Sequence, residues 1–228
     1  MIRFLGRLAL VAAVGAAVPV AVFGVRAMAE TPPAQTAAAR SEGEDLYRRG
    51  LYPEAIAWWT EQAAKGDVES ARRLGVEYMD GKGGVVERDY EKARTYHLQA
   101  AKGGERRSMM DLGTIHEHGL GVEADLIEAA RWYEWSGKYG YGPGQYNFAT
   151  MLETGDAGRK DEVEAYKYYL LAAAQGVAGI GYDAKSNRVL GPDETPMGLL
   201  ARRLTPAQIA DAKARVKAFK AMTGPLPA

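Results

Sequence analysis

The sequence predicts an all-α fold: an α-solenoid of antiparallel helix pairs with a C-terminal helical cap. Three observations carry this prediction. Glycines and alanines recur every 36 to 38 residues, two ring-bearing side chains follow each alanine, and small or apolar residues form a helical stripe between the glycines. Self-similarity at such a period is the mark of a repeat architecture, in which stacked units bury one continuous core.

The repeat is visible as columns of equivalent residues. The first glycine column, with spacings of 38, 36 and 36, is Gly66, Gly104, Gly140 and Gly176. The second glycine column is Gly81, Gly119 and Gly155. The alanine column is Ala55, Ala93, Ala129 and Ala165. The rings that follow the alanines are Trp58-Trp59, Tyr96-His97, Trp132-Tyr133 and Tyr168-Tyr169.

Each unit is predicted to contain two helices. The first runs between two glycines, for example over residues 67–80, and the second carries the alanine and the rings, for example over residues 90–102. Residues four apart on the first helix form one stripe: Ser70, Leu74 and Tyr78, then Ser108, Leu112 and His116, then Gly144, Phe148 and Leu152. Glycines at the helix ends are expected to take positive φ and permit tight turns.

The repeat frame is expected to span residues 44–176, followed by an irregular segment and a capping helix within 177–228. The third unit departs from the pattern, since Phe148-Ala149 replaces its Leu-Gly pair, and the register fails after Gly176. A helix should resume at Thr205 as N-cap with Pro206 next. Its apolar side suits a cap over the last repeat: Ile209, Ala212, Val216 and Phe219.

The first residues read as a targeting segment. Arg3 and Arg7 precede 18 uncharged residues, and Ala27-Met28-Ala29 then provides the small residues that a signal peptidase reads. We expect a cleaved signal peptide over 1–29, with an uncleaved membrane anchor as the alternative. Residues 30–43, rich in Pro, Ala and Thr, should form a flexible leader. Either alternative predicts an exported chain.

The stretches LGVEYMDGKGGVVERDYEKARTYHLQAAKGG and LGTIHEHGLGVEADLIEAARWYEWSGKYG resemble the Sel-one-like repeat family, a relative of the tetratricopeptide repeat. The resemblance covers roughly residues 46–176, and the opening unit, with its short turn at Gly50, is more similar to a tetratricopeptide hairpin. It implies a right-handed superhelix and a scaffold or periplasmic regulator. Some secreted relatives with disulfide-linked repeats are associated with β-lactam binding, but their cysteines are absent here.

Composition and motifs give no sign of catalysis. Basic and acidic residues number 29 each, so no general attraction to nucleic acid is expected, and the absence of cysteine excludes disulfides, thiolate metal sites and a cysteine nucleophile. The chain lacks GxSxG, HExxH and a phosphate loop. His116 and His118 are two residues apart on a helix and so point apart. We therefore expect no enzyme, no cofactor and no metal, although a hydrolase stays a minor alternative.

A partner-binding surface is predicted on the first helices, on the side opposite the packed stripe. Its side chains change from unit to unit while the stripe repeats, which indicates recognition. The predicted partner-binding residues are Arg72, Met110, Tyr146, Glu69, Arg107, Glu117 and Glu153. The first three occupy one position in successive units and should face solvent as a ribbon on the concave face.

These observations predict an exported, non-enzymatic adaptor or regulator that binds a protein partner of the bacterial envelope, in the periplasm. The alternative localisation is an inner-membrane anchor facing the periplasm. The alternative function is a periplasmic cell-wall or glycan-binding protein, with or without hydrolytic activity. That alternative requires exposed rings and clustered carboxylates along the concave face, and Tyr139 and Tyr141, which lie outside the columns, are the candidates for exposed rings.

Overall fold

The computed structural model describes residues 42–81, 86–177, 182–183, 188–189 and 191–227. These residues belong to one compact unit, Arg40–Ala228. The predicted signal peptide or anchor over 1–29 lies outside the described residues.

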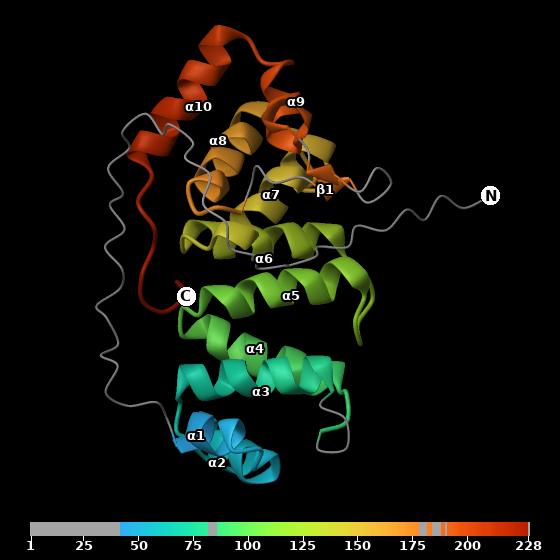
Figure 1. Cartoon of the computed structure of the whole chain (residues 1–228), viewed down its shortest axis with the longest axis vertical. Coiled ribbons are helices and arrows are strands. Elements are labelled where there is room, and N and C mark those ends of the chain that lie inside the picture. Colours follow the sequence, from blue (N-terminus) through green and yellow to red (C-terminus); the bar gives the residue numbers. More distant parts are fainter. Residues whose placement is uncertain (1–41, 82–85, 178–181, 184–187, 190, 228) are drawn as a thin grey trace, which may run out of the picture. The chain divides into compact units, whose positions relative to one another are not determined.

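Helices that follow one another in the sequence pack as pairs, and each pair packs on the next (Figure 1). The pairs are α1 (Glu42–Arg48) with α2 (Tyr52–Ala64), α3 (Val68–Asp80) with α4 (Tyr90–Lys102), α5 (Arg106–His118) with α6 (Leu126–Lys138), and α7 (Gly142–Thr154) with α8 (Glu162–Ala173). The predicted α-solenoid of helix pairs is thereby confirmed, and the two helices predicted for the second unit match α3 and α4.

Carboxylates cap the N-termini of α3, α4, α5, α6 and α8, and glycines follow the C-termini of α3, α4, α5 and α7. The Asp67 side chain accepts from the backbone N–H of Ser70 at α3, and Asp89 accepts from that of Lys92 at α4. Such caps satisfy N–H groups that have no partner inside the helix. At the other end, Gly119 follows α5 with φ of 64°, as predicted for its column. A β-branched residue resists that conformation.

The core forms where the rings of the second helices meet the small residues of the first helices. The four alanines of the alanine column are fully buried. Gly113 on α5 lies beneath the ring of Tyr133 on α6, so closely that an added Cβ would lie 2.5 Å from two ring carbons. Gly75 on α3 makes the same approach to the ring of His97. The Leu-Gly pair of the repeat therefore provides a helix surface on which a ring can lie.

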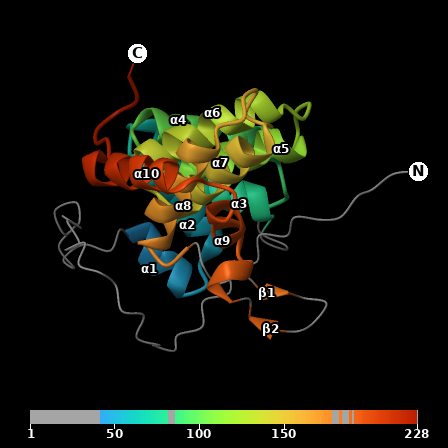
Figure 2. The ribbon, with the colours of Figure 1, turned by 90° about the horizontal axis from the view of Figure 1, so that it is seen from above.

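The region after the repeats contains described elements that the sequence did not predict. It contains two short antiparallel strands, β1 (Tyr182–Asp183) and β2 (Arg188–Val189), the 3₁₀ turn η1 (Pro192–Glu194), α9 (Pro196–Ala201) and α10 (Pro206–Ala218). Both α9 and α10 pack against α8 (Figure 2). Ala212 of α10 joins the core formed by α7 and α8, and Ile209 packs against it. The strands and α9 were not predicted.

Among the residues that the structure describes, none of the helices combines the length and apolar composition needed to cross a bilayer.

Candidate functional site

The seven predicted partner-binding residues lie on α3, α5 and α7, and we call the surface that they define the first-helix face. Only Glu69 and Arg107 are exposed there. Met110 and Tyr146 are half-buried and pack against the core between α6 and α8. Glu117 and Glu153 are also half-buried, and each accepts a hydrogen bond from a tyrosine of the following helix.

The prediction that Arg72 faces solvent was wrong. Its relative exposure is 6%, because α5 packs against α3 and brings Glu105 and Asp111 toward the guanidinium. Arg72 Nε donates to Glu69 Oε2 at 2.8 Å, and this bond raises the pKa of Arg72 above its ordinary value. Met110 and Tyr146 are half-buried, so the prediction that all three side chains form a solvent-facing ribbon is corrected for these two residues as well. Truncating these three side chains would disturb packing as well as binding.

Two successive units contain the same hydrogen-bonded group of threonine, tyrosine and glutamate, which we call the triad. In the α5–α6 unit, Tyr133 Oη donates to Glu117 Oε2 at 2.7 Å and lies 3.2 Å from Thr114 Oγ1. Burial and the carboxylate raise the pKa of Tyr133, so its hydroxyl stays protonated. The tyrosine thereby fixes the orientation of a carboxylate at the first-helix face.

The triad recurs in the α7–α8 unit with one addition. Tyr169 Oη donates to Glu153 Oε2 at 2.9 Å and lies 3.1 Å from Thr150 Oγ1. Here Arg203, which follows α9, also donates to Glu153 Oε1 at 2.6 Å. The chain's own C-terminal region therefore pairs an arginine with the carboxylate of the last triad. The sequence signal for the triads is a tyrosine 19 residues after a threonine and 16 after a glutamate, which sequence reasoning missed.

The α3–α4 unit has a buried polar cluster in place of a triad. His97 occupies the tyrosine position, has no exposed surface, and places Nδ1 3.1 Å from Ser108 Oγ and 3.7 Å from Asp111 Oδ2. Burial, assisted by the charge of Arg72, lowers the pKa of His97 to about 4. Burial, assisted by Glu105, raises the pKa of Asp111 to about 7. Near neutral pH the histidine is therefore uncharged.

The rings proposed for glycan binding are not exposed. Tyr139, predicted to be exposed, has a relative exposure of 4%, because the C-terminal residues cover it and the carbonyl of Pro225 accepts its hydroxyl. Tyr141 is half-buried, and Tyr146 packs edge-on against Tyr169. The large hydrophobic residues that are exposed in the described part of the chain are aliphatic: Leu126, Ile127, Val177 and Leu199. The glycan hypothesis thus gains no specific support.

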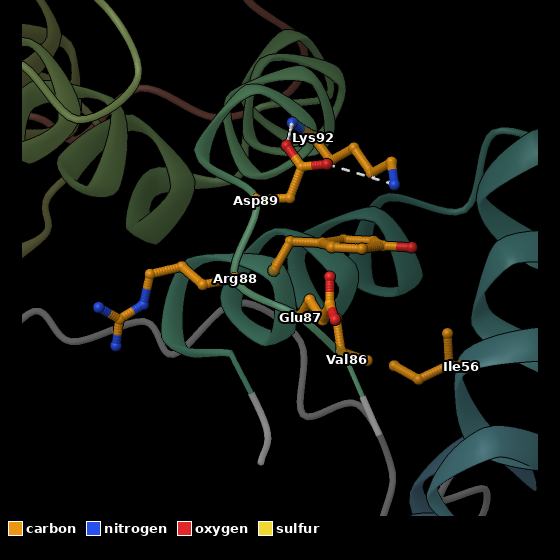
Figure 3. A pocket seen from close by; sticks show the side chains of 7 residues that line it. Ile56, Val86, Glu87, Arg88, Asp89 and Lys92 are labelled. Atoms are coloured by element: carbon orange, nitrogen blue, oxygen red, sulfur yellow. Dashed lines mark hydrogen bonds and ion pairs between the residues drawn. The ribbon is translucent and has the colours of Figure 1, made fainter. Parts of the chain in front are cut away.

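A hollow of about 290 Å³ lies between α2 and the start of α4 (Figure 3). Two of its polar side chains, Asp89 and Lys92, already have structural partners. Asp89 caps α4 through the N–H of Lys92, and the Lys92 ammonium lies 3.2 Å from Asp89 Oδ2. The ammonium also lies over the ring of Tyr78. Groups of three or more potential metal ligands do not occur among the described residues.

Stacked antiparallel helix pairs with caps and rings at a constant period define a helical-repeat scaffold. The family model of the Sel1 repeat matches residues 68–105, 106–134 and 142–177. The region 68–177 therefore contains three Sel1 repeats, so the family resemblance is confirmed. Sel1 repeat proteins act as interaction, adaptor or regulator scaffolds and are in general not catalytic.

Individual proteins are similar to parts of the chain. The chain is 33% identical over 90 residues to the mouse (Mus musculus) protein sel-1 homolog 2, a match that covers 39% of this chain and 13% of that protein. It is 27% identical over 150 residues to an exopolysaccharide production negative regulator of Rhizobium leguminosarum bv. viciae, covering 60% of this chain and 56% of the relative. The chain thus spans only part of each relative.

A solved structure shares the fold. A protective antigen present in uropathogenic Escherichia coli strains, which displays an SLR fold, aligns with a TM-score of 0.57 and 26% identity. The alignment covers 76% of this chain and 36% of that protein.

Proposed function

We propose that the chain is an exported, non-enzymatic adaptor or regulator, which binds a protein partner in the bacterial periplasm through the first-helix face. The Sel1 repeats support a scaffold role, and the name of the rhizobial relative describes a regulator. The basic, apolar and Ala-x-Ala pattern of residues 1–29 supports export.

One observation carries the choice of surface: the two triads are equivalent, but among the residues that the structure describes only the Glu153 triad pairs with an arginine. Arg203 donates to Glu153, and this pair shows how a cation binds to the carboxylate of a triad. Glu117 is held in the same way by Tyr133. A partner that presents an arginine or lysine could therefore bind Glu117 as Arg203 binds Glu153, since hydrogen bonds with charged donors are the stronger ones.

The surroundings of Glu117 suit a protein segment. Arg107 lies on the same helix, α5, is exposed, and carries a charge opposite to that of Glu117. Met110 lies between Arg107 and Glu117 on that helix. Mixed charges with Met and Tyr are typical of protein interfaces, where aromatic residues, Met and Arg are enriched. A polyanion such as nucleic acid would require an excess of positive charge, which this surface does not have.

Site-specific crosslinking tests the surface. A photo-crosslinking residue at position 107 lies on the first-helix face, whereas one at position 131 replaces an exposed arginine on the second helix α6. We expect the 107 variant to crosslink one envelope protein and the 131 variant to crosslink none. Equal crosslinking from both positions, or crosslinking from 131 alone, would reject the first-helix face as the binding surface.

Amino-terminal sequencing tests export. Mature protein should begin at Glu30 and fractionate with the periplasm, because a signal peptidase would cleave after Ala29. An intact Met1 on membrane-bound protein would instead support the anchor.

A further inference from the structure

Residues 219–227, which follow α10, form an extended segment that we call the tail. It leaves α10 at Phe219 and returns along the ends of the second helices α6 and α4 (Figure 1). The tail contains no helix or strand of its own. Its position is therefore set by what it contacts.

Two backbone bonds attach the tail to equivalent places in successive repeats. The N–H of Met222 donates to the carbonyl of Lys138 at 2.8 Å, and the N–H of Leu226 donates to the carbonyl of Lys102 at 3.0 Å. Lys102 and Lys138 are the last residues of α4 and α6, 36 positions apart. Carbonyls at a helix C-terminus have no partner inside the helix. The repeat frame thus presents a row of acceptors along one edge, and the tail uses two of them.

Side chains complete the attachment. Met222 and Leu226 pack against the core cluster that contains Ala101 and Tyr139, and the Tyr139 hydroxyl donates to the carbonyl of Pro225 at 2.9 Å. Backbone bonds to a row of acceptors, with apolar anchors at intervals, are the way in which extended peptides are recognised.

Glycine columns make room for the tail. The carbonyl oxygen of Gly224 occupies the space where Gly104 would carry a Cβ, and an added Cβ at Gly140 would lie 2.9 Å from the Cβ of Ala221. Gly224 itself has φ of 82°, which favours glycine at that place in the bound segment. The site therefore selects an apolar residue, a glycine two positions later and an apolar residue two positions after that.

We infer that this edge is a second protein-binding site, separate from the first-helix face, and that it takes an extended segment of a partner with the pattern apolar-x-Gly-x-apolar. The tail is its occupant in the free chain and competes with the partner. Since the tail is tethered at the end of α10, its effective concentration at the edge is on the order of millimolar, so a partner segment binds only weakly until the tail is displaced.

The test uses the full chain and a labelled synthetic peptide of residues 217–227, with binding followed by fluorescence anisotropy. In the variant M222D/L226D the charged side chains should expel the tail from the apolar edge. We expect this variant to bind the peptide at least about tenfold more tightly than wild type does. The same peptide with both aspartates should bind neither protein, and adding Tyr139→Phe to the expelled-tail variant should weaken binding about fivefold, since one hydrogen bond is lost.

A second measurement does not depend on the folding of the M222D/L226D variant. A protease site inserted after Ala218 allows the tail of a folded wild-type chain to be cut, and the cut tail should then exchange with labelled peptide on dilution. A chain that keeps its helicity after tail expulsion or cleavage, but binds no peptide, would overturn the inference. A concentration-dependent dimer without peptide binding would overturn it too, and would assign the edge to tail exchange between copies.

Discussion

The α5–α6 and α7–α8 units have the same triad but differ in what completes it. In both, a buried tyrosine donates to a glutamate at the first-helix face and lies within hydrogen-bond distance of a threonine. In the α7–α8 unit, Arg203 from beyond the repeats pairs with Glu153, whereas Glu117 has no equivalent arginine among the described residues. The repeat therefore orients these carboxylates as part of its frame, while the arginine that pairs with Glu153 comes from outside the repeats.

The α3–α4 unit extends the comparison. Val76 and Met79 replace the threonine and the glutamate of the triad, and His97 replaces the tyrosine. The His97 Nε2 atom is buried and has no hydrogen-bond partner within the described part of the chain. An unsatisfied buried polar atom costs about 1–3 kcal/mol, and the α5–α6 unit contains one as well, Trp132 Nε1.

The largest effect should come from the glycine beneath the triad tyrosine. Gly113→Ala adds a Cβ against the Tyr133 ring, which is buried and cannot move aside, so we expect a loss of about 1–3 kcal/mol in the free energy of unfolding. The equivalent position in the next unit already carries a Cβ at Ala149. There, Ala149→Gly should cost only about 1 kcal/mol through helix propensity and lost packing. Urea unfolding measures the free energy lost in both variants. A loss for Gly113→Ala no larger than that for Ala149→Gly would contradict the expectation that the added Cβ clashes with the Tyr133 ring.

Removing a tyrosine hydroxyl should separate the two triads. Tyr133→Phe leaves Glu117 without its donor, and we expect a loss of about 1–2 kcal/mol. Tyr169→Phe should cost less, because Glu153 keeps the bond from Arg203. The contrast is measured by urea unfolding of both variants, and a larger loss for Tyr169→Phe would contradict it.

Much of this frame could be predicted from the sequence, because helix periodicity and caps depend on neighbours a few residues apart. The glycine and alanine columns placed α3 and α4 correctly, and the stripe from Ser70 to Leu74 is buried. The exposure of Arg72 could not be predicted, since it depends on how closely α5 approaches α3. The pairing of Arg203 with Glu153 joins residues 50 positions apart and has no repeated counterpart, and the tail covers Tyr139 for the same kind of non-local reason.

The unit with His97 should respond to pH through two opposing groups. Folded Asp111 has a raised pKa of about 7, so the folded state holds its proton more tightly, and this contribution to stability is lost as pH rises from about 4 to 7. Folded His97 has a lowered pKa of about 4, so its contribution increases as pH rises from about 4 to 6.5. Two charged neighbours also influence these pKa values: the charge of Arg72 lowers the pKa of both His97 and Asp111, and the charge of Glu105 raises that of Asp111.

Asp111→Asn removes one of these groups. We therefore expect the variant to gain stability between pH 4.5 and 6.5, relative to wild type, by on the order of 1 kcal/mol. Urea unfolding at several pH values measures the difference between the two proteins. A variant whose pH dependence matches that of wild type would show that Asp111 does not titrate in this window.

The smallest effect on stability should come from Arg203. Its side chain is 46% exposed, so solvent screens the pair with Glu153, and Arg203→Ala should change the free energy of unfolding by less than about 1 kcal/mol. Thermal melting measures this change. A loss of several kcal/mol would mean that Arg203 is needed to stabilise the fold. The Arg203–Glu153 pair would then not indicate how a partner's cation binds Glu117.

Whether the Glu117 carboxylate binds the partner is measured by the affinity of the crosslinked partner for Glu117→Gln, compared with its affinity for Glu123→Gln. The first substitution keeps an oxygen that can accept the Tyr133 hydroxyl but removes the charge, and the second removes a charge from an exposed residue of the α5–α6 loop. We predict that Glu117→Gln weakens binding at least about tenfold, equivalent to roughly 1.4 kcal/mol, while Glu123→Gln leaves it unchanged. Equal affinity of both variants and wild type would contradict the claim that the triad carboxylate binds the partner.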